Sequence, residues 1–121
     1  MTPRQNRHYL EDILGAIEAT ERFVAGMTFE ALAEDEKTIR ALERELEIIG
    51  EAVKKLPDTW TSSYPQISWR AVAGMRDRLI HHYWDTEVEI LWQTIRESLP
   101  PLKQVIQTLI ASHQSSQETH E

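Results

Sequence analysis

The segment from Met75 to Asp85 (MRDRLIHHYWD) holds the densest group of side chains that could do chemistry. It contains two arginines, two histidines, one tyrosine and two aspartates, and no other stretch of the chain compares. Histidine can carry a proton in either direction near neutral pH, and arginine binds phosphate oxygens through paired hydrogen bonds. Side chains of these types could hold a phosphate and move a proton beside it.

The spacing within this segment separates its two main candidates on an ideal helix. Arg76 and Tyr83 are seven residues apart and share the apolar face of Ile80. His81 follows Arg76 by five residues, which is a rotation of about 140°. Bringing Arg76 and His81 together therefore requires a local distortion or a second subunit. Without either, Arg76 could pair with a carboxylate of a neighbouring helix, and His81 could be a protonated histidine at a helix end.

A metal site is the other possibility for this segment. His81 and Asp85 are four residues apart, and His82 lies between them. A helix is predicted to end between His81 and Asp85, and the ligand set is incomplete, so no metal or other cofactor is expected. The chain also has no cysteine, no glycine-rich phosphate loop and no serine nucleophile motif.

Amphipathic helices must position this segment, because apolar residues recur every three or four positions along most of the chain. The pattern predicts helices over residues 9–25, 35–56, 68–83, 86–99 and 102–110, with a short helical turn over 28–32. Residues 58–67 are predicted as a loop that Trp60 and Tyr64 anchor. No stretch alternates apolar and polar residues as a strand does. We therefore predict an all-α antiparallel bundle of four to five helices.

The helix ends are predicted from residues that cap or break helices. Side-chain oxygens are expected to cap the following helix at Thr28, Asp35 and Ser68, and Thr86 with Glu89 has the spacing of a capping box. Pro57 is expected to stop the second long helix, and Pro100-Pro101 to break or kink the chain. The buried stripe of the second long helix is predicted to be Ile39, Leu42, Leu46, Ile49, Val53 and Leu56.

Length and composition describe one domain. The chain has 121 residues, of which 40% are hydrophobic and 27% charged. We predict a domain over residues 1–112 and a polar, disordered tail over 113–121. The lack of cysteine suits a reducing compartment, and no apolar stretch approaches the roughly 18 residues of a membrane span. A cytoplasmic protein with no membrane contact is expected.

The formal net charge of −7 opposes broad adhesion to nucleic acid or anionic lipid. Its distribution is uneven. Residues 1–50 carry 6 basic and 11 acidic groups, residues 85–121 carry 2 and 6, and residues 51–84 carry 5 and 3. A polyanion should therefore prefer the middle third of the chain, which includes the Met75 to Asp85 segment.

Arg76, four residues, His81, one residue and Tyr83 form a pattern that resembles the Arg-x4-His-x-Tyr signature of HepT-like toxins, a branch of the HEPN ribonucleases. The resemblance covers roughly residues 8–110. Residues 38–56 (TIRALERELEIIGEAVKKL) resemble the second long helix of that family, and residues 64–70 (YPQISWR) with 74–77 (GMRD) resemble its lead-in to the catalytic helix.

The resemblance implies a HEPN-like bundle that forms a homodimer, with two copies of the motif lining a cleft where RNA is cut without a metal. By position, Arg76 would bind or polarise the scissile phosphate, His81 would act as general acid or base, and Asp77 would orient them. Further support for RNA binding would come from Arg70, Arg78 and His82. The family commonly has glycine where this chain has His82, so a second imidazole could join the site as proton donor.

The same resemblance implies regulation by a partner. Members of the family are paired with a minimal nucleotidyltransferase antitoxin, MntA-like, which adds AMP to the motif tyrosine, here Tyr83. The predicted function is therefore a metal-independent endoribonuclease toxin of a type VII-like toxin-antitoxin pair. The alternative is a non-catalytic HEPN module that binds nucleotide or RNA and docks and regulates its nucleotidyltransferase partner.

Overall fold

The computed structural model describes residues 3–75 and 84–119. Its elements in chain order are α1 (Pro3–Val24), α2 (Phe29–Ala33), α3 (Glu36–Val53), α4 (Asp58–Thr61), α5 (Trp69–Ala73), α7 (Trp84–Gln93), the π-helix η1 (Thr94–Ser98) and α8 (Leu99–Thr119). No strand occurs within these two ranges. The predicted all-α class is confirmed.

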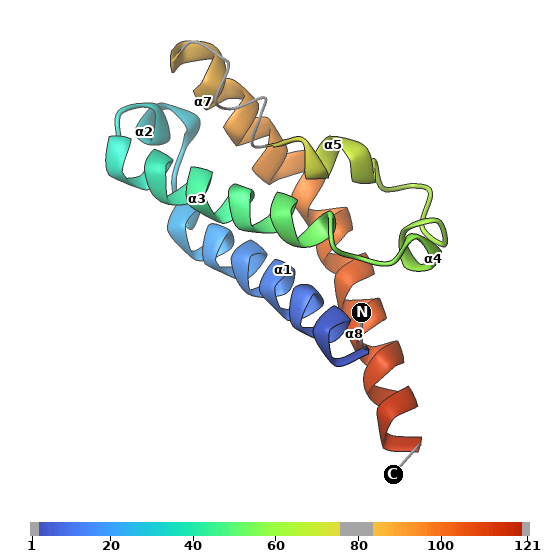
Figure 1. Ribbon diagram of the computed structural model, residues 1–121. Helices are drawn as coiled ribbons and strands as arrows, with labels where there is room; N and C mark the ends of the chain where they lie inside the picture. The colour runs from blue at the N-terminus through green and yellow to red at the C-terminus, as the bar shows by residue number, and fades with distance from the viewer. Residues whose placement is uncertain (1–2, 76–83, 120–121) are drawn as a thin grey trace.

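The long helices form an antiparallel bundle. Figure 1 shows α1 and α3 side by side and running in opposite directions, with α8 packed along α1. The elements α7, η1 and α8 follow one another as a single long rod, and α5 lies over the C-terminal part of α3. None of the described helices is long and apolar enough to cross a membrane.

The core lies where the apolar stripes of these helices meet. The predicted stripe of α3 is confirmed, since all six residues from Ile39 to Leu56 are at most 6% exposed, although Leu56 lies just past the helix end at Val53. The stripe packs with fully buried residues of the other long helices, namely Leu10, Ile13, Ile17, Leu91, Leu102 and Ile106. Burial of this continuous apolar surface is the main force that holds the helices together.

Two of the predicted caps are confirmed. The Thr28 hydroxyl accepts a hydrogen bond from the backbone N–H of Ala31 at 3.1 Å and begins α2. Asp35 accepts from the backbone N–H of Thr38 at 3.0 Å and from its hydroxyl at 2.7 Å, and these bonds lower the pKa of Asp35. Ser68 precedes α5 as predicted, but its side chain makes no capping hydrogen bond.

Several predicted boundaries are wrong. The helix predicted over 68–83 is interrupted, because α5 ends at Ala73 and Gly74 takes a non-helical C-cap conformation. Thr86 lies inside α7, so it cannot be the residue that precedes the helix, and the predicted capping box fails. The segment 58–67 contains the helical turn α4, although Trp60 and Tyr64 pack against the core as predicted.

The predicted break at Pro100-Pro101 is also wrong, because the helix continues through both prolines. It does so by widening in η1, where the N–H of Leu99 donates to the carbonyl of Thr94 five residues earlier. Because the rod is continuous, Pro100 and Pro101 donate no hydrogen bond to the carbonyls one turn earlier, and the π-turn lies directly before them. A π-turn is a known way for a helix to absorb such an irregularity.

The C-terminal part of α8 reaches back to the 58–67 segment. The ring of Trp60 stacks on that of His113, with centroids 3.9 Å apart and planes 30° apart. Burial lowers the pKa of His113 below its ordinary value. The backbone is helical to Thr119, beyond the residue 112 at which the sequence places the end of the domain, and that boundary stays a prediction.

Candidate functional site

The side chains predicted to do chemistry lie in one interval of the chain, residues 76–83. Arg76, Asp77, Arg78, His81, His82 and Tyr83 all fall outside the described residues. The structure describes the two attachments of this interval, which are Met75 after α5 and the start of α7 at Trp84. The helical geometry predicted for Arg76, His81 and Tyr83 therefore stays a prediction.

The entry to the interval is anchored in the core. Met75 is 2% exposed and Val72, one turn earlier, is 6% exposed. The loop before α5 is held by the indole of Trp69, whose Nε1 donates to the carbonyl of Tyr64 at 3.0 Å. Because Met75 is buried, the residue that directly precedes Arg76 has a fixed position on the bundle.

A close approach of two backbones sets the position of α5 on α3. A Cβ built on Gly50 would lie 3.2 Å from the carbonyl oxygen of Ala73 and 3.3 Å from that of Val72. Gly50 is buried near the C-terminal end of α3, and the two carbonyls approach α3 at this residue, which has no side chain. Glycine at this position lets α5 pack directly against the α3 backbone.

We expect Gly50→Ala to loosen α5 while changing the global stability little. The added methyl forces the α5 carbonyls away by a few tenths of an ångström, and alanine gains up to about 1 kcal/mol of helix propensity in return. Hydrogen exchange should therefore accelerate at the amides of Val72 and Gly74, which donate to the backbone carbonyls of Ser68 and Arg70.

Gly15→Ala is the matched control for this substitution. A Cβ at Gly15 in α1 has no heavy atom within 4 Å, so alanine there should raise the free energy of unfolding by about 0.5–1 kcal/mol and leave α5 exchange unchanged. If both substitutions stabilise the protein equally and hydrogen exchange at the α5 amides is unchanged, the close approach at Gly50 does not constrain the position of α5.

The exit from the interval is anchored by α7. Val88 and Leu91 are 3% and 0% exposed. The ring of Trp92 meets Phe29 of α2 edge to face with centroids 6.2 Å apart, and the guanidinium of Arg96 lies 5.3 Å from the Trp92 ring centroid. Such ring and cation contacts add to the burial that fixes α7. Residues 76–83 therefore connect two ends that are both packed on the same bundle.

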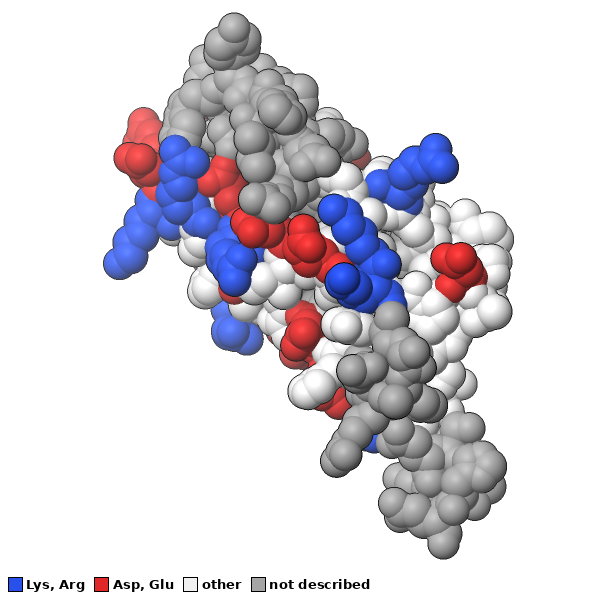
Figure 2. Space-filling model, viewed as in Figure 1, with Lys and Arg blue, Asp and Glu red and all other residues white. Residues whose placement is uncertain are grey.

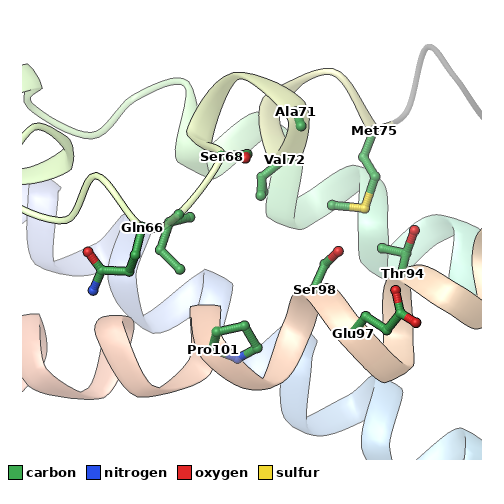
Figure 3. Close-up of a pocket in the computed structure, with 10 residues that line it drawn as sticks. Gln66, Ser68, Ala71, Val72, Met75, Thr94, Glu97, Ser98 and Pro101 are labelled. Atoms are coloured by element: carbon green, nitrogen blue, oxygen red, sulfur yellow. The ribbon is translucent and has the colours of Figure 1, made fainter.

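A pocket of about 280 Å³ lies beside the entry, between α5 and the η1–α8 rod. Figure 3 shows Ser98 reaching up from the rod toward Val72 and Met75, with the Glu97 carboxylate beside Thr94. The full lining is Gln66, Ile67, Ser68, Ala71, Val72, Met75, Thr94, Glu97, Ser98 and Pro101. The pocket thus adjoins the residue that leads directly into Arg76.

Sequence reasoning did not find the pocket residues of the rod. Thr94, Glu97 and Ser98 lie outside every motif, and their relation to α5 depends on the π-turn that the proline pair accompanies. The sequence signal that could have indicated the π-turn is the Pro100-Pro101 pair inside an otherwise continuous amphipathic pattern.

The charged side chains on the face shown in Figure 2 are mixed in sign, with acidic residues between basic ones. On α3 the basic groups pair locally, as Arg40 does with Glu43 at 2.9 Å and Arg44 with Glu47 at 3.3 Å. Arg70 of α5 is exposed and makes no ion pair with another described residue. Of the three residues predicted to support RNA binding, it is the one that the structure describes, and its charge is available to a ligand.

Metal ligands do not gather in the described part of the chain, where no group of three histidine, aspartate or glutamate residues could hold an ion. The possible set of His81, His82 and Asp85 lies outside the residues whose side chains are described. The metal alternative for that set is therefore left to experiment.

Comparison with known proteins also covers residues 76–83. The sequence model of the family described as "Ribonuclease HepT-like" matches residues 13–109, a range that includes Arg76 to Tyr83. A protein of Thermococcus cleftensis named "Probable ribonuclease HepT" is 47% identical over 100 residues, which are 83% of this chain and 91% of that protein.

Two further relatives are each named "Putative RNase". One, from Methanocaldococcus jannaschii, is 41% identical over 83% of this chain and 83% of its own length. The other, from Caldanaerobacter subterraneus subsp. tengcongensis, is 40% identical over 86% of this chain and 93% of its own length. No solved structure matches the chain. The family match and these identities over most of the chain show that it belongs to the HepT-like ribonuclease family.

Proposed function

We propose that this chain is a metal-independent endoribonuclease, the toxin of a type VII-like toxin-antitoxin pair. The observation that carries the proposal is the family match over residues 13–109, within which Arg76, His81 and Tyr83 keep the spacing of the family signature. The packing of Met75 and α7 supports it, because catalytic groups need a rigid frame on either side. The test is cleavage of RNA by the purified chain with divalent metal removed.

The proposed chemistry divides among three side chains. Arg76 binds the scissile phosphate and neutralises the charge that grows on its oxygens. His81 transfers a proton to or from the reacting oxygen, and Asp77 orients the two groups. Arg70 and Arg78 hold the flanking phosphates, and His82 is the second candidate proton donor.

The proposed active form is a homodimer with the motif of each copy at a shared cleft. Arg76 and His81 point about 140° apart on an ideal helix, and a two-fold axis can supply the missing partner from the other copy. We expect light scattering at micromolar concentration to give the mass of two chains. A monomer with full nuclease activity would show that each chain completes its own site.

The proposed control is AMP attachment to Tyr83 by a minimal nucleotidyltransferase antitoxin. The added phosphodiester and base would obstruct the cleft and repel RNA phosphate. We expect the partner enzyme with ATP to add one AMP mass to the peptide that carries Tyr83 and to stop RNA cleavage. Tyr83→Phe should escape both effects. Modification at Tyr9 or Tyr64 instead, or silencing of Tyr83→Phe by the partner's catalytic activity, would contradict this control.

The second candidate is a non-catalytic HEPN module that binds nucleotide or RNA and docks its nucleotidyltransferase partner. The charges on the face shown in Figure 2 are mixed in sign on a chain of net charge −7, which favours docking of a protein partner over broad adhesion to a polyanion. The two candidates differ in one result. The module binds RNA and leaves it intact, whereas the nuclease produces fragments.

A further inference from the structure

We propose that the pocket between α5 and η1–α8 binds one unpaired RNA base next to the cleavage site, and that Glu97 selects a base with amino or imino donors on its pairing edge. This proposal rests on the proposed ribonuclease function and names a specificity residue for it. Its starting point is position. Met75 lines the pocket and directly precedes Arg76 in the chain, so the pocket lies at the entry to the segment that is proposed to hold the scissile phosphate.

The walls of the pocket suit the faces of a base. Its inner side is formed by Ile67, Val72 and Met75, which are at most 7% exposed, and Pro101 closes the side toward α8. Apolar walls of this kind favour burial of the faces of a planar base. The volume of about 280 Å³ falls just below the range of pockets for drug-sized ligands and is large enough for a single base.

The rim offers hydrogen-bonding groups that nothing else in the described structure uses. Gln66, Ser68, Glu97 and Ser98 are exposed, and their side chains make no hydrogen bond or ion pair with another described residue. Thr94 differs, because its hydroxyl donates to the carbonyl of Ile90 at 2.7 Å. Figure 3 shows the Ser98 hydroxyl pointing from the rod toward α5, and the Glu97 carboxylate at the edge of the pocket below Thr94.

Glu97 sets the choice of base because it is the one ionisable side chain in the pocket lining. An ionised carboxylate only accepts hydrogen bonds and can accept two in parallel. The pairing edge of guanine presents two adjacent N–H donors, and cytosine and adenine each present an amino group. Uracil presents one N–H between two carbonyl oxygens, which the carboxylate repels. The expected order is guanine first and uracil last.

The exposed arginine of α5 fits the same arrangement. Arg70 stands one residue before Ala71 and two before Val72, both of which line the pocket. A base inside the pocket leaves its sugar and phosphate outside, where an arginine without a described partner can contact them. The base contact would then specify sequence and the arginine would supply affinity.

The test measures base preference at each position around the cut in a randomised single-stranded RNA. For the wild-type chain we expect one position adjacent to the cut to favour guanine over uracil. Glu97→Gln should lower that ratio by about tenfold, the scale of one good base-specific hydrogen-bond pair. Ala71→Leu, which fills the pocket from α5, should lower it as well. Glu18→Gln removes the same charge from the exposed face of α1 and should leave the ratio unchanged.

A second readout separates this proposal from the ribonuclease assignment. The methyl group of Met75 lines the pocket, whereas that of Met27 does not, so labelled methionine methyl signals report occupancy without any cleavage. Added GMP should shift the Met75 signal more than UMP does, and Glu97→Gln should remove the difference.

The outcomes fall into distinct classes. Cleavage with a preference that Glu97→Gln and Ala71→Leu leave unchanged overturns the pocket and keeps the nuclease. Absence of cleavage with a GMP-selective shift of Met75 overturns the nuclease and keeps a nucleotide-binding pocket. Equal or absent shifts for GMP and UMP, together with unselective cleavage, overturn the role given to Glu97.

Discussion

Replacing His81 by alanine is expected to lower the rate of RNA cleavage by about 10²–10⁴, the range that a positioned general acid or base contributes. The fold should survive, because the packing that anchors the interval comes from Met75 on one side and α7 on the other. Single-turnover cleavage of a defined RNA gives the rate, and the far-ultraviolet circular dichroism and Tm of the variant give its fold.

His82→Ala is the matched control, since it removes a neighbouring imidazole of the same size. If His81 is the proton carrier, His82→Ala should lower the rate far less than His81→Ala does. The reverse order would assign the proton to His82, where the family commonly has glycine. A wild-type rate in both single variants and in Arg76→Ala would contradict the proposed chemistry altogether.

Met75→Ala is expected to reduce the free energy of unfolding by about 2–5 kcal/mol. Met75 is 2% exposed in the core, and truncation of a buried residue of this size loses its transfer free energy and leaves a cavity. A domain of this size has only about 5–15 kcal/mol to lose, so Tm should fall clearly. Urea unfolding followed by circular dichroism measures the change.

Met75→Leu separates packing from chemistry at the same position. Leucine conserves volume, so the cost should be less than about 1.5 kcal/mol. RNA cleavage at a temperature where both variants are folded should remain close to wild type in Met75→Leu and fall in Met75→Ala, because Arg76 follows directly. Equal stability of the two variants would mean that this contact does not hold the entry to the site.

The sequence was sufficient where local chemistry decides the structure. The six-residue stripe from Ile39 to Leu56 is buried as predicted, because a three-and-four spacing leaves one face of a helix apolar whatever packs on it. Thr28 and Asp35 cap their helices as predicted, because the donors they satisfy lie three residues away in the same chain.

Prediction failed where distant contacts or backbone choices compete with periodicity. The pattern over 68–83 continues through Gly74, but α5 ends there, where its carbonyls meet the α3 backbone at Gly50. The proline pair was expected to break or kink the chain, and the helix instead continues through both prolines after the π-turn at Thr94–Ser98. Neither outcome is encoded in a hydrophobic pattern, because each depends on which element lies alongside.

The candidate site, too, could be predicted from the sequence only in part. The residue types and spacing of Arg76, His81 and Tyr83 could be identified from the sequence, and the family match bears out the resemblance that they carry. Their mutual geometry stays a prediction, since residues 76–83 lie outside the described ranges. The pocket with Glu97 could not be predicted, because α5 and the η1–α8 rod are brought together only by the tertiary fold.

Incubation of the purified wild-type chain with a defined single-stranded RNA in excess EDTA tests the proposed activity most directly. Metal-independent catalysis by Arg76 and His81 predicts discrete fragments whose ends map to internal positions, at the rate seen without chelator. RNA that stays intact in EDTA and is cut only after zinc or manganese is restored would contradict it, and would make His81, His82 and Asp85 a metal site.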